Sequence, residues 1–191
     1  MQSQIISLKA KRKSAGTKIA FYAAAAAAIG AIPIPISAAV LLTPLQITMA
    51  THIINSYGLG SIENLAKTTI SATIIPMLGR TLVGNIIKVI PGIGSALGSV
   101  INGGVAASIT TILGCAISQI CYVCCEKIAK GETINLAEEF NADALESAID
   151  TFTKIIKNKG KNEFISSEEV DSNKVKEFTD TYRKEYGRDK V

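Results

Sequence analysis

A glycine-rich run near the middle of the chain is the first segment whose residue types could do chemistry, because glycine loops can cradle phosphate groups. The run reads Pro91-Gly92-Ile93-Gly94-Ser95-Ala96-Leu97-Gly98. A Walker A loop needs a Gly-Lys pair followed by Ser or Thr, and the chain contains no such sequence. The dinucleotide fingerprint Gly-x-Gly-x-x-Gly is missed as well, because the third glycine comes one position late. We therefore expect no phosphate site and no cofactor here.

Four cysteines form the second group that could do chemistry. Cys121, Cys124 and Cys125 have the spacing of one helical face, and Cys115 lies six residues earlier, rotated off that face. Zinc needs four ligands in a structural site, and the single histidine is more than sixty residues away. Clustering also disfavours a disulfide framework. We expect buried thiols that act as small hydrophobes, with juxtamembrane acylation and a metal site as the alternatives.

The histidine, His52, lies in an apolar stretch, and no Ser, Asp or Glu is placed by sequence to form a triad with it. A hydrogen-bonded structural role is therefore expected. Paired carboxylates are equally unsupported, because Glu63 is the one acid between residues 19 and 125. With no catalytic residue and no metal ligand set, the sequence predicts a protein that is not an enzyme.

The elements that would position these groups are set by an uneven distribution of charge. The chain has 191 residues, of which 48% are apolar and 19% charged, with a net charge of +4. Residues 1–18 carry five basic side chains and no acid, residues 19–125 carry four charges, and residues 126–191 carry twelve basic and fifteen acidic side chains. This apolar content excludes a disordered chain, and the small positive surplus argues against nucleic acid as a partner.

Two long segments lack formal charge: 44 residues from Ile19 to Ile62 and 37 from Val89 to Cys125. A transmembrane helix needs roughly 20 such residues. Prolines divide these segments, and we expect structural turns at Pro33, Pro35, Pro91 and Gly92, with further interruptions at Pro44 and Pro76. The first apolar helix is expected from Ile19 to Ile32, ending at Pro33. The prediction is an all-α chain of broken apolar helices that form membrane-associated hairpins. A soluble helical bundle is the alternative, since residues 19–125 also hold 23 Ser, Thr, Asn or Gln residues.

Small residues recur at four-residue spacing after the glycine-rich run. One ridge contains Ser95, Ser99, Gly103 and Ala107, and a neighbouring ridge contains Gly94, Gly98, Asn102, Ala106, Thr110 and Gly114. Such ridges let helix backbones approach closely, within one chain or between copies. We expect helix packing at Gly94, Ser95, Gly98, Ser99, Gly103 and Ala107, and interhelical hydrogen bonds from Asn102 and Thr110.

The charged C-terminal third predicts two amphipathic helices. Asn135 and Glu138 have capping-box spacing, and apolar residues follow at helical intervals up to Ile156. A second helix is expected from about Asp171 to Tyr186, with Val175, Phe178 and Tyr182 on one face. The predicted organisation is therefore a basic leader (1–18), an apolar helical domain (19–130) and a charged amphipathic region (131–191).

Basic residues beside the first apolar helix predict the orientation. Lys9, Lys11, Arg12, Lys13 and Lys18 should keep the N-terminus in the cytoplasm, and the charged C-terminal third is most easily left on the same side. A cleaved signal peptide is the alternative for residues 1–30, although the basic stretch is long and the apolar run continues past any cleavage site.

Two segments resemble one bacterial family. The segments are Gly30-Ala31-Ile32-Pro33-Ile34-Pro35-Ile36-Ser37, followed by Leu41-Leu42-Thr43-Pro44-Leu45-Gln46, and later Lys88-Val89-Ile90-Pro91-Gly92-Ile93-Gly94-Ser95. Their order and spacing resemble a helical domain of unknown function that follows the G domain in certain Era-like GTPases and is similar to YcjF-type inner-membrane proteins. The resemblance covers roughly residues 8–130.

The resemblance implies a membrane-associated helical module of the bacterial inner membrane, with a separately encoded GTPase as a partner. Ala38 and Ala39 stand where the family commonly has an acid, and no residues match the GTPase motifs. The expected function is a non-enzymatic module that anchors or assembles, with membrane lipid, a GTPase or a second copy as partners. The alternatives are a protein that inserts into membranes as a pore former or effector, and a soluble helical regulator.

Overall fold

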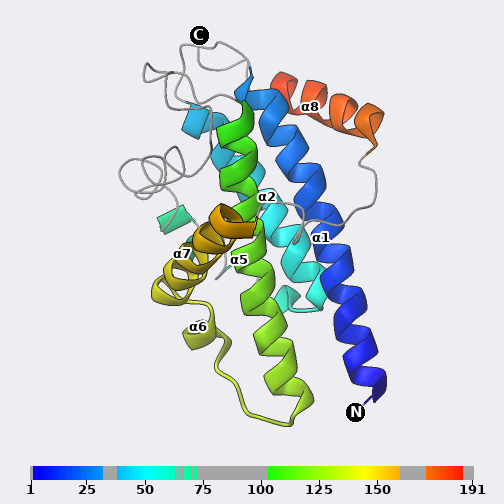
Figure 1. The fold of residues 1–191 in the computed structure, drawn as a ribbon, viewed down its shortest axis with the longest axis vertical. Helices are drawn as coiled ribbons and strands as arrows, with labels where there is room; N and C mark the ends of the chain where they lie inside the picture. Colours follow the sequence, from blue (N-terminus) through cyan, green and yellow to red (C-terminus); the bar gives the residue numbers. More distant parts are fainter. Residues whose placement is uncertain are drawn as a thin grey trace.

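The fold is known from a computed structural model, which describes residues 2–31, 38–62, 64, 67–69, 71–72, 103–159 and 171–186. The described elements are all helices, as the sequence predicts (Figure 1). They are α1 (Gln2–Gly30), α2 (Ala38–Tyr57), the 3-10 helix η1 (Gly60–Ile62), α5 (Gly103–Ala129), α6 (Leu136–Glu139), α7 (Ala142–Lys159) and α8 (Ser172–Tyr186).

Helix α1 is longer than the sequence suggests. A short helix from Ile19 to Ile32 was expected after a separate basic segment, but α1 is continuous over 29 residues, about 43 Å at 1.5 Å per residue. The reason is that Lys, Arg, Ala and Leu are all good helix formers, so a change in charge does not end a helix. The helix ends at Gly30, before the predicted proline turn, and Pro33 and Pro35 lie outside the described residues.

Helix α2 passes through Pro44, where an interruption was expected. Proline removes one backbone donor from a helix interior and crowds the preceding turn. In α2 that residue lies in the second turn, and the Thr48 hydroxyl donates to the Pro44 carbonyl at 2.9 Å. The helix ends at Tyr57, and the φ of 75° at the following residue, Gly58, permits a Schellman cap in which Leu59 N donates to Ile54 O at 3.2 Å.

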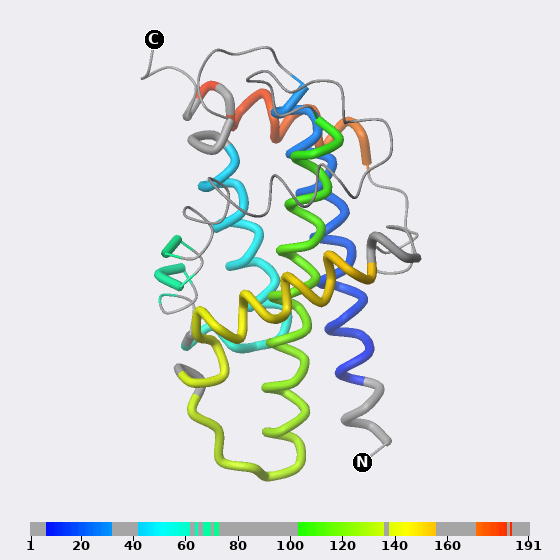
Figure 2. The backbone as a smooth tube through the Cα atoms, turned by 60° about the vertical axis from the view of Figure 1, so that its left-hand side comes forward, coloured from blue at the N-terminus to red at the C-terminus, as the bar shows by residue number. Residues whose placement is uncertain are grey.

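Three long helices form the centre of the molecule. α1 packs against both α2 and α5, and α2 packs against α5. The two figures show α1 running in the direction opposite to α2 and α5 (Figures 1 and 2). α7 crosses α5 obliquely, and α8 lies across the C-terminal half of α1. One hydrophobic core includes side chains from all five helices.

The C-terminal region differs from the prediction in one place. The expected helix from residue 136 is divided into α6 and α7, because Asn141 starts a new helix: its Oδ1 accepts from Ala144 N at 2.9 Å. Asn135 and Glu138 do interact at the start of α6, at 2.8 Å. α8 begins after Asp171, whose Oδ1 accepts from Asn173 N and Lys174 N.

Candidate functional site

Helix α5 is the element of greatest functional interest. Of the helices that the structure describes, it is the one that is long and apolar enough to cross a membrane. It carries no charge from Gly103 to Cys125, and Glu126 and Lys127 are its first charged residues. Within the protein it lies against α1, α2 and α7, and 17 of its 27 residues are buried. Buried core helices of soluble proteins share these properties.

Glycines allow α5 to lie very close to α1. A Cβ atom at Gly103 would lie 2.4 Å from the backbone oxygen of Ala27. A Cβ at Gly114 would lie 2.7 Å from Ile19 Cγ1 and 3.2 Å from Met49 Sδ. All three distances are shorter than ordinary van der Waals contact, so a side chain at either position would require its neighbours to shift. Gly103 therefore packs against a second helix of the same chain.

The other predicted packing residues divide between two groups. Ala107 is half-buried on α5, and the hydroxyl of Thr111 donates to its carbonyl at 2.8 Å. The remaining packing positions and turn residues lie outside the described residues: Gly94, Ser95, Gly98, Ser99, Pro91 and Gly92, together with Pro33 and Pro35.

Two buried polar contacts between side chains join α2 to α5. Gln46 Nε2 donates to Thr110 Oγ1 at 3.4 Å, which confirms the interhelical bond expected of Thr110. The Tyr57 hydroxyl lies 2.8 Å from Ser118 Oγ. Burial raises the pKa of Tyr57 to about 12, although its hydrogen bond to Ser118 favours the ionised form. Gln46 belongs to one of the family-like segments, but the sequence did not indicate its contact with Thr110, and Tyr57 belongs to no recognisable spacing pattern.

The four cysteines lie on α5 as buried, unpaired thiols. Among the described residues, no cluster of three His, Cys, Asp or Glu side chains could hold a metal ion. Cys125 Sγ donates to the Tyr57 carbonyl at 3.5 Å, at the end of α2. Thiols held in such surroundings are poor nucleophiles, so these residues contribute to packing.

Lysines of α1 bind the C-terminal end of α2. Lys11 Nζ donates to the Tyr57 carbonyl at 2.8 Å, and Lys18 Nζ donates to the His52 carbonyl at 3.2 Å and to the Ser56 hydroxyl. A helix C-terminus has unsatisfied carbonyls and partial negative charge, so ammonium groups are stabilising there. Sequence reasoning assigned these lysines to membrane orientation alone, because the cap they provide is on another helix.

His52 is hydrogen-bonded, as expected. Its Nδ1 lies 2.7 Å from the hydroxyl of Tyr22, a residue whose pKa is raised to about 12 by burial. Tyr22 and Phe21 also contact Phe178 of α8, with ring centroids 5.7 and 5.3 Å apart. α8 is therefore held on α1 by aromatic rings.

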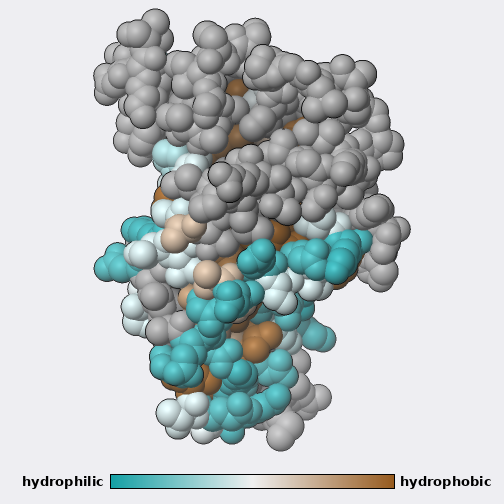
Figure 3. Space-filling view, turned by 90° about the vertical axis from the view of Figure 1, so that its left-hand side faces the viewer, coloured by the Kyte–Doolittle hydropathy of each residue, from teal (hydrophilic) through white to brown (hydrophobic). Residues whose placement is uncertain are grey.

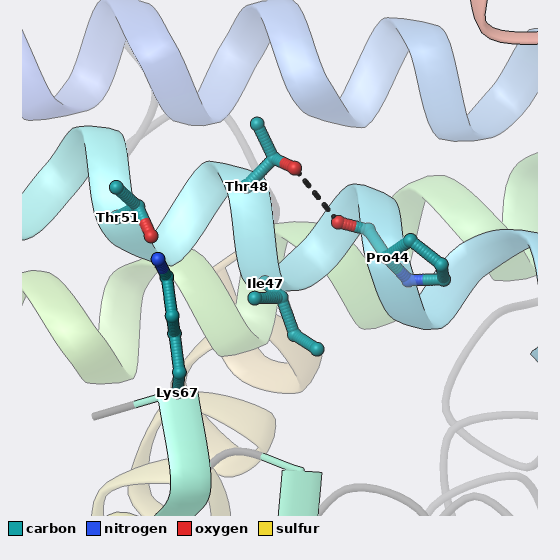
Figure 4. A pocket seen from close by; sticks show the side chains of 5 residues that line it. All are labelled: Pro44, Ile47, Thr48, Thr51 and Lys67. Carbon is teal, nitrogen blue, oxygen red and sulfur yellow. Dashed lines mark hydrogen bonds between the residues drawn. The ribbon is translucent and has the colours of Figure 1, made fainter. Parts of the chain in front are cut away.

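A shallow groove of about 350 Å³ lies on α2, lined by Pro44, Ile47, Thr48, Thr51 and Lys67. Lys67 extends toward Thr51 (Figure 4), whose buried hydroxyl oxygen has no hydrogen-bond partner among the described residues. These five lining residues include no carboxylate, thiol or imidazole, and Lys67 is the one ionisable side chain among them.

The described surface that includes α7 is mostly hydrophilic, with small apolar areas between the polar side chains (Figure 3). The molecule thus combines an apolar central helix, glycine contacts that fix it to α1, and polar side chains on the helix that crosses it. No family model, curated protein or solved structure matches the chain.

Proposed function

We propose that the chain is a non-enzymatic, membrane-associated helical module in which α5 is the segment that enters the bilayer. The observation that carries the proposal is the combination of a charge-free segment from Gly103 to Cys125 with its burial beneath other helices. These 23 residues extend about 34 Å as a helix, against a hydrocarbon core of roughly 30 Å.

Helix α7 is suited to be the part that moves when α5 meets lipid. It lies on α5 through Leu145, Ile149 and Phe152, which are 0%, 2% and 5% exposed. Its other side carries exposed charges, including Glu146 and Lys154. A helix with this division can transfer its apolar face from a protein core to the membrane interface without exposing that face to water.

Flotation of the intact protein with lipid vesicles tests the proposal. The expected result is that the protein floats with the vesicles and resists an alkaline carbonate wash, because an inserted apolar helix is not removed by breaking charge contacts. Recovery of all the protein in the lipid-free fraction would overturn the proposal and favour the soluble regulator.

A matched pair of α7 variants tests the role of this helix. Ile149→Ala removes a buried contact with the core, and Glu146→Ala changes an exposed residue of the same helix. We expect Ile149→Ala to increase vesicle flotation because α7 is released more easily, and Glu146→Ala to leave flotation unchanged. Circular dichroism must show that both variants remain folded. Equal flotation of the two folded variants would show that helices other than α7 keep α5 away from lipid.

Dye release from the same vesicles separates an anchor from a pore former. An anchoring module binds without releasing the trapped dye. Rapid release at low protein concentration would instead support the inserting effector, in which α5 lines or opens a pore. The burial of α5 beneath α7 is compatible with both anchoring and pore formation. We prefer the anchoring module because α5 has few polar side chains that could line a pore.

The two family-like segments support a GTPase partner. A homo-oligomer stays a prediction, because the ridge residues Gly103 and Gly114 already pack against other helices of the same chain. We place both termini on the cytoplasmic side of a bacterial inner membrane, because the basic residues of α1 precede its charge-free half. This placement requires an even number of crossings, and therefore a second segment that crosses the membrane together with α5. Co-purification of the tagged chain from detergent-solubilised bacterial membranes tests the partner. A GTPase in stoichiometric amount is the expected result, and recovery of the chain alone would contradict it.

A further inference from the structure

An ion pair joins the end of α5 to α6. Lys127 Nζ donates to Glu139 Oε1 across the turn that connects the two helices, and the two side chains are 35% and 26% exposed. The pair Lys154–Asp150, by contrast, links residues four positions apart on α7 and is more exposed. Lys127–Glu139 is therefore a partly buried tertiary contact, whereas Lys154–Asp150 is local to one helix.

The turn between α5 and α6 has the properties of a pivot. It lies at the end of the molecule that is far from α8 (Figures 1 and 2), and residues 130–133 are exposed. Gly131 has a φ of 79°, and no described atom lies within 4 Å of the position that a Cβ would take there. A change in the backbone at Gly131 therefore displaces no described side chain.

The corner between α6 and α7 is held together by Asn141. Its Nδ2 donates to the Glu138 carbonyl of α6 at 2.6 Å, and its Oδ1 accepts from Ala144 N of α7 at 2.9 Å. Phe140, at the same corner, is fully buried. We therefore expect α6 and α7 to move as one body about the turn at Gly131, and this movement must break the pair between α5 and α6.

A bilayer replaces some contacts of α6 and α7 and not others. Lipid chains are as apolar as the leucine, isoleucine and phenylalanine side chains by which α7 lies on α5, so those contacts do not oppose transfer of α5 to lipid. An ion pair has no counterpart in hydrocarbon. We propose that Lys127–Glu139 is a latch that keeps α6 and α7 closed over α5 and thereby limits its entry into the bilayer; this inference rests on the membrane association proposed above.

Hydrogen exchange of the intact chain without lipid tests the latch. Glu139→Ala removes one partner, and Asp150→Ala, which breaks the local pair of α7, is the matched control. We expect exchange in α6 and α7 to become about 3-fold faster in Glu139→Ala, as for loss of a partly exposed ion pair, and to stay unchanged in the control.

The partner residue makes this test specific to the pair. Lys127→Ala should give the same increase as Glu139→Ala, and the double variant should exchange no faster than either single variant, because one interaction is lost only once. Multiplied effects in the double variant, or equal acceleration by Asp150→Ala, would overturn the latch.

Flotation of the same variants with vesicles of phosphatidylcholine and phosphatidylglycerol separates the latch from the proposed function. Glu139→Ala and Asp150→Ala each remove one negative charge, so general attraction to the vesicles changes equally. We expect the partition coefficient of Glu139→Ala to be about 3-fold higher than that of Asp150→Ala. If no variant floats, membrane association is overturned, and hydrogen exchange still decides whether the latch closes α6 and α7 over α5. Faster exchange with equal flotation would overturn the role of the latch in membrane entry.

Discussion

Helix α1 makes two contacts of opposite character, one with α5 and one with α8. Against α5 the backbones nearly touch, because Gly103 lies over Ala27 and Gly114 over Ile19. Against α8 the contact is made by rings: Phe178 lies edge-on to Phe21 and is stacked on Tyr182 at 5.8 Å. We refer to these as the glycine contact and the aromatic contact.

The difference indicates which helix can leave. In the glycine contact, a small shift of either backbone loses many close contacts at once. α1 and α5 are therefore expected to stay together when other helices open. The aromatic contact depends on a few large side chains, and each ring can be hydrated separately. α8 should therefore open at a lower free energy than the α1–α5 pair, which is the usual behaviour of peripheral elements with few buried contacts.

The largest expected effect comes from filling the glycine contact. In Gly103→Ala the new methyl group would overlap the backbone oxygen of Ala27, and backbone cannot rotate away as a side chain can. Overpacking of this kind costs about 1–3 kcal/mol. The adjacent Gly104 is exposed, so Gly104→Ala should be neutral or stabilising by up to about 1 kcal/mol, through helix propensity alone. Urea unfolding measures both, and equal stabilisation by the two substitutions would contradict the glycine contact.

Sequence patterns predicted surfaces better than they predicted partners. The small residues around Gly103 indicated where a backbone could approach, but a small residue carries no information about which helix will fill the space. The same holds for Phe178 and Tyr182, which were placed on one face of a helix without any indication that Phe21 and Tyr22 would face them. Residues far apart in the chain meet because of the tertiary fold, and local spacing does not encode that choice.

Two local predictions were wrong for physical reasons. The change from basic to apolar residues at Lys18 was interpreted as the start of a helix, although charge has little effect on whether Ala-, Lys- and Arg-rich backbone is helical. Pro44 was expected to interrupt α2, but packing of the helix against α1 and α5 outweighs one lost backbone hydrogen bond. In both places the tertiary context decided the helix boundary.

The aromatic contact gives a smaller, local effect. Phe178→Ala removes a partly buried ring that contacts Phe21, Tyr22 and Tyr182, at a cost of about 2 kcal/mol. Hydrogen exchange should accelerate in the amides of α8 and remain slow in those of α5. The exposed neighbour Glu177 provides the control, since Glu177→Ala should change neither. Equal acceleration in α5 would show that α8 does not open separately.

Two tyrosine hydroxyls allow a buried contact with α5 to be compared with a contact beside α8: Tyr57 bonds Ser118, and Tyr22 bonds His52. Tyr57→Phe leaves the Ser118 hydroxyl buried without its partner and should cost about 1–2 kcal/mol. Tyr22→Phe should cost less, because its partner His52 is exposed and can bind water instead. Urea unfolding of the two variants is the measurement, and a larger loss in Tyr22→Phe would contradict this order.

The raised pKa values of the same two residues predict alkaline unfolding. Both phenols have a pKa of about 12 in the folded chain, against about 10 when unfolded. Their contribution to stability is therefore complete below pH 10 and is lost as the pH rises toward 12. Ultraviolet titration should show that two tyrosines ionise well above pH 10, and that each Phe variant removes one of them. Ionisation of both groups near pH 10 in the folded protein would contradict their burial.

The smallest effect concerns the start of α8, and α7 provides its internal control. Asp171 caps α8 through its carboxylate, and the backbone N–H of Lys174 is the main cause that lowers the pKa of that carboxyl. Asn141 caps α7 with an amide that does not titrate. A carboxyl whose pKa is lower in the folded chain stabilises the fold at pH values above its pKa in the unfolded chain, which is about 4. The α8 cap should therefore weaken as the pH falls below about 4, whereas the α7 cap should not. Hydrogen exchange in the first turn of each helix measures this, and Asp171→Asn should remove the pH dependence of α8 while retaining an acceptor. If both helices lost protection together on acidification, the cause would be global unfolding and α8 would have no separate acid response.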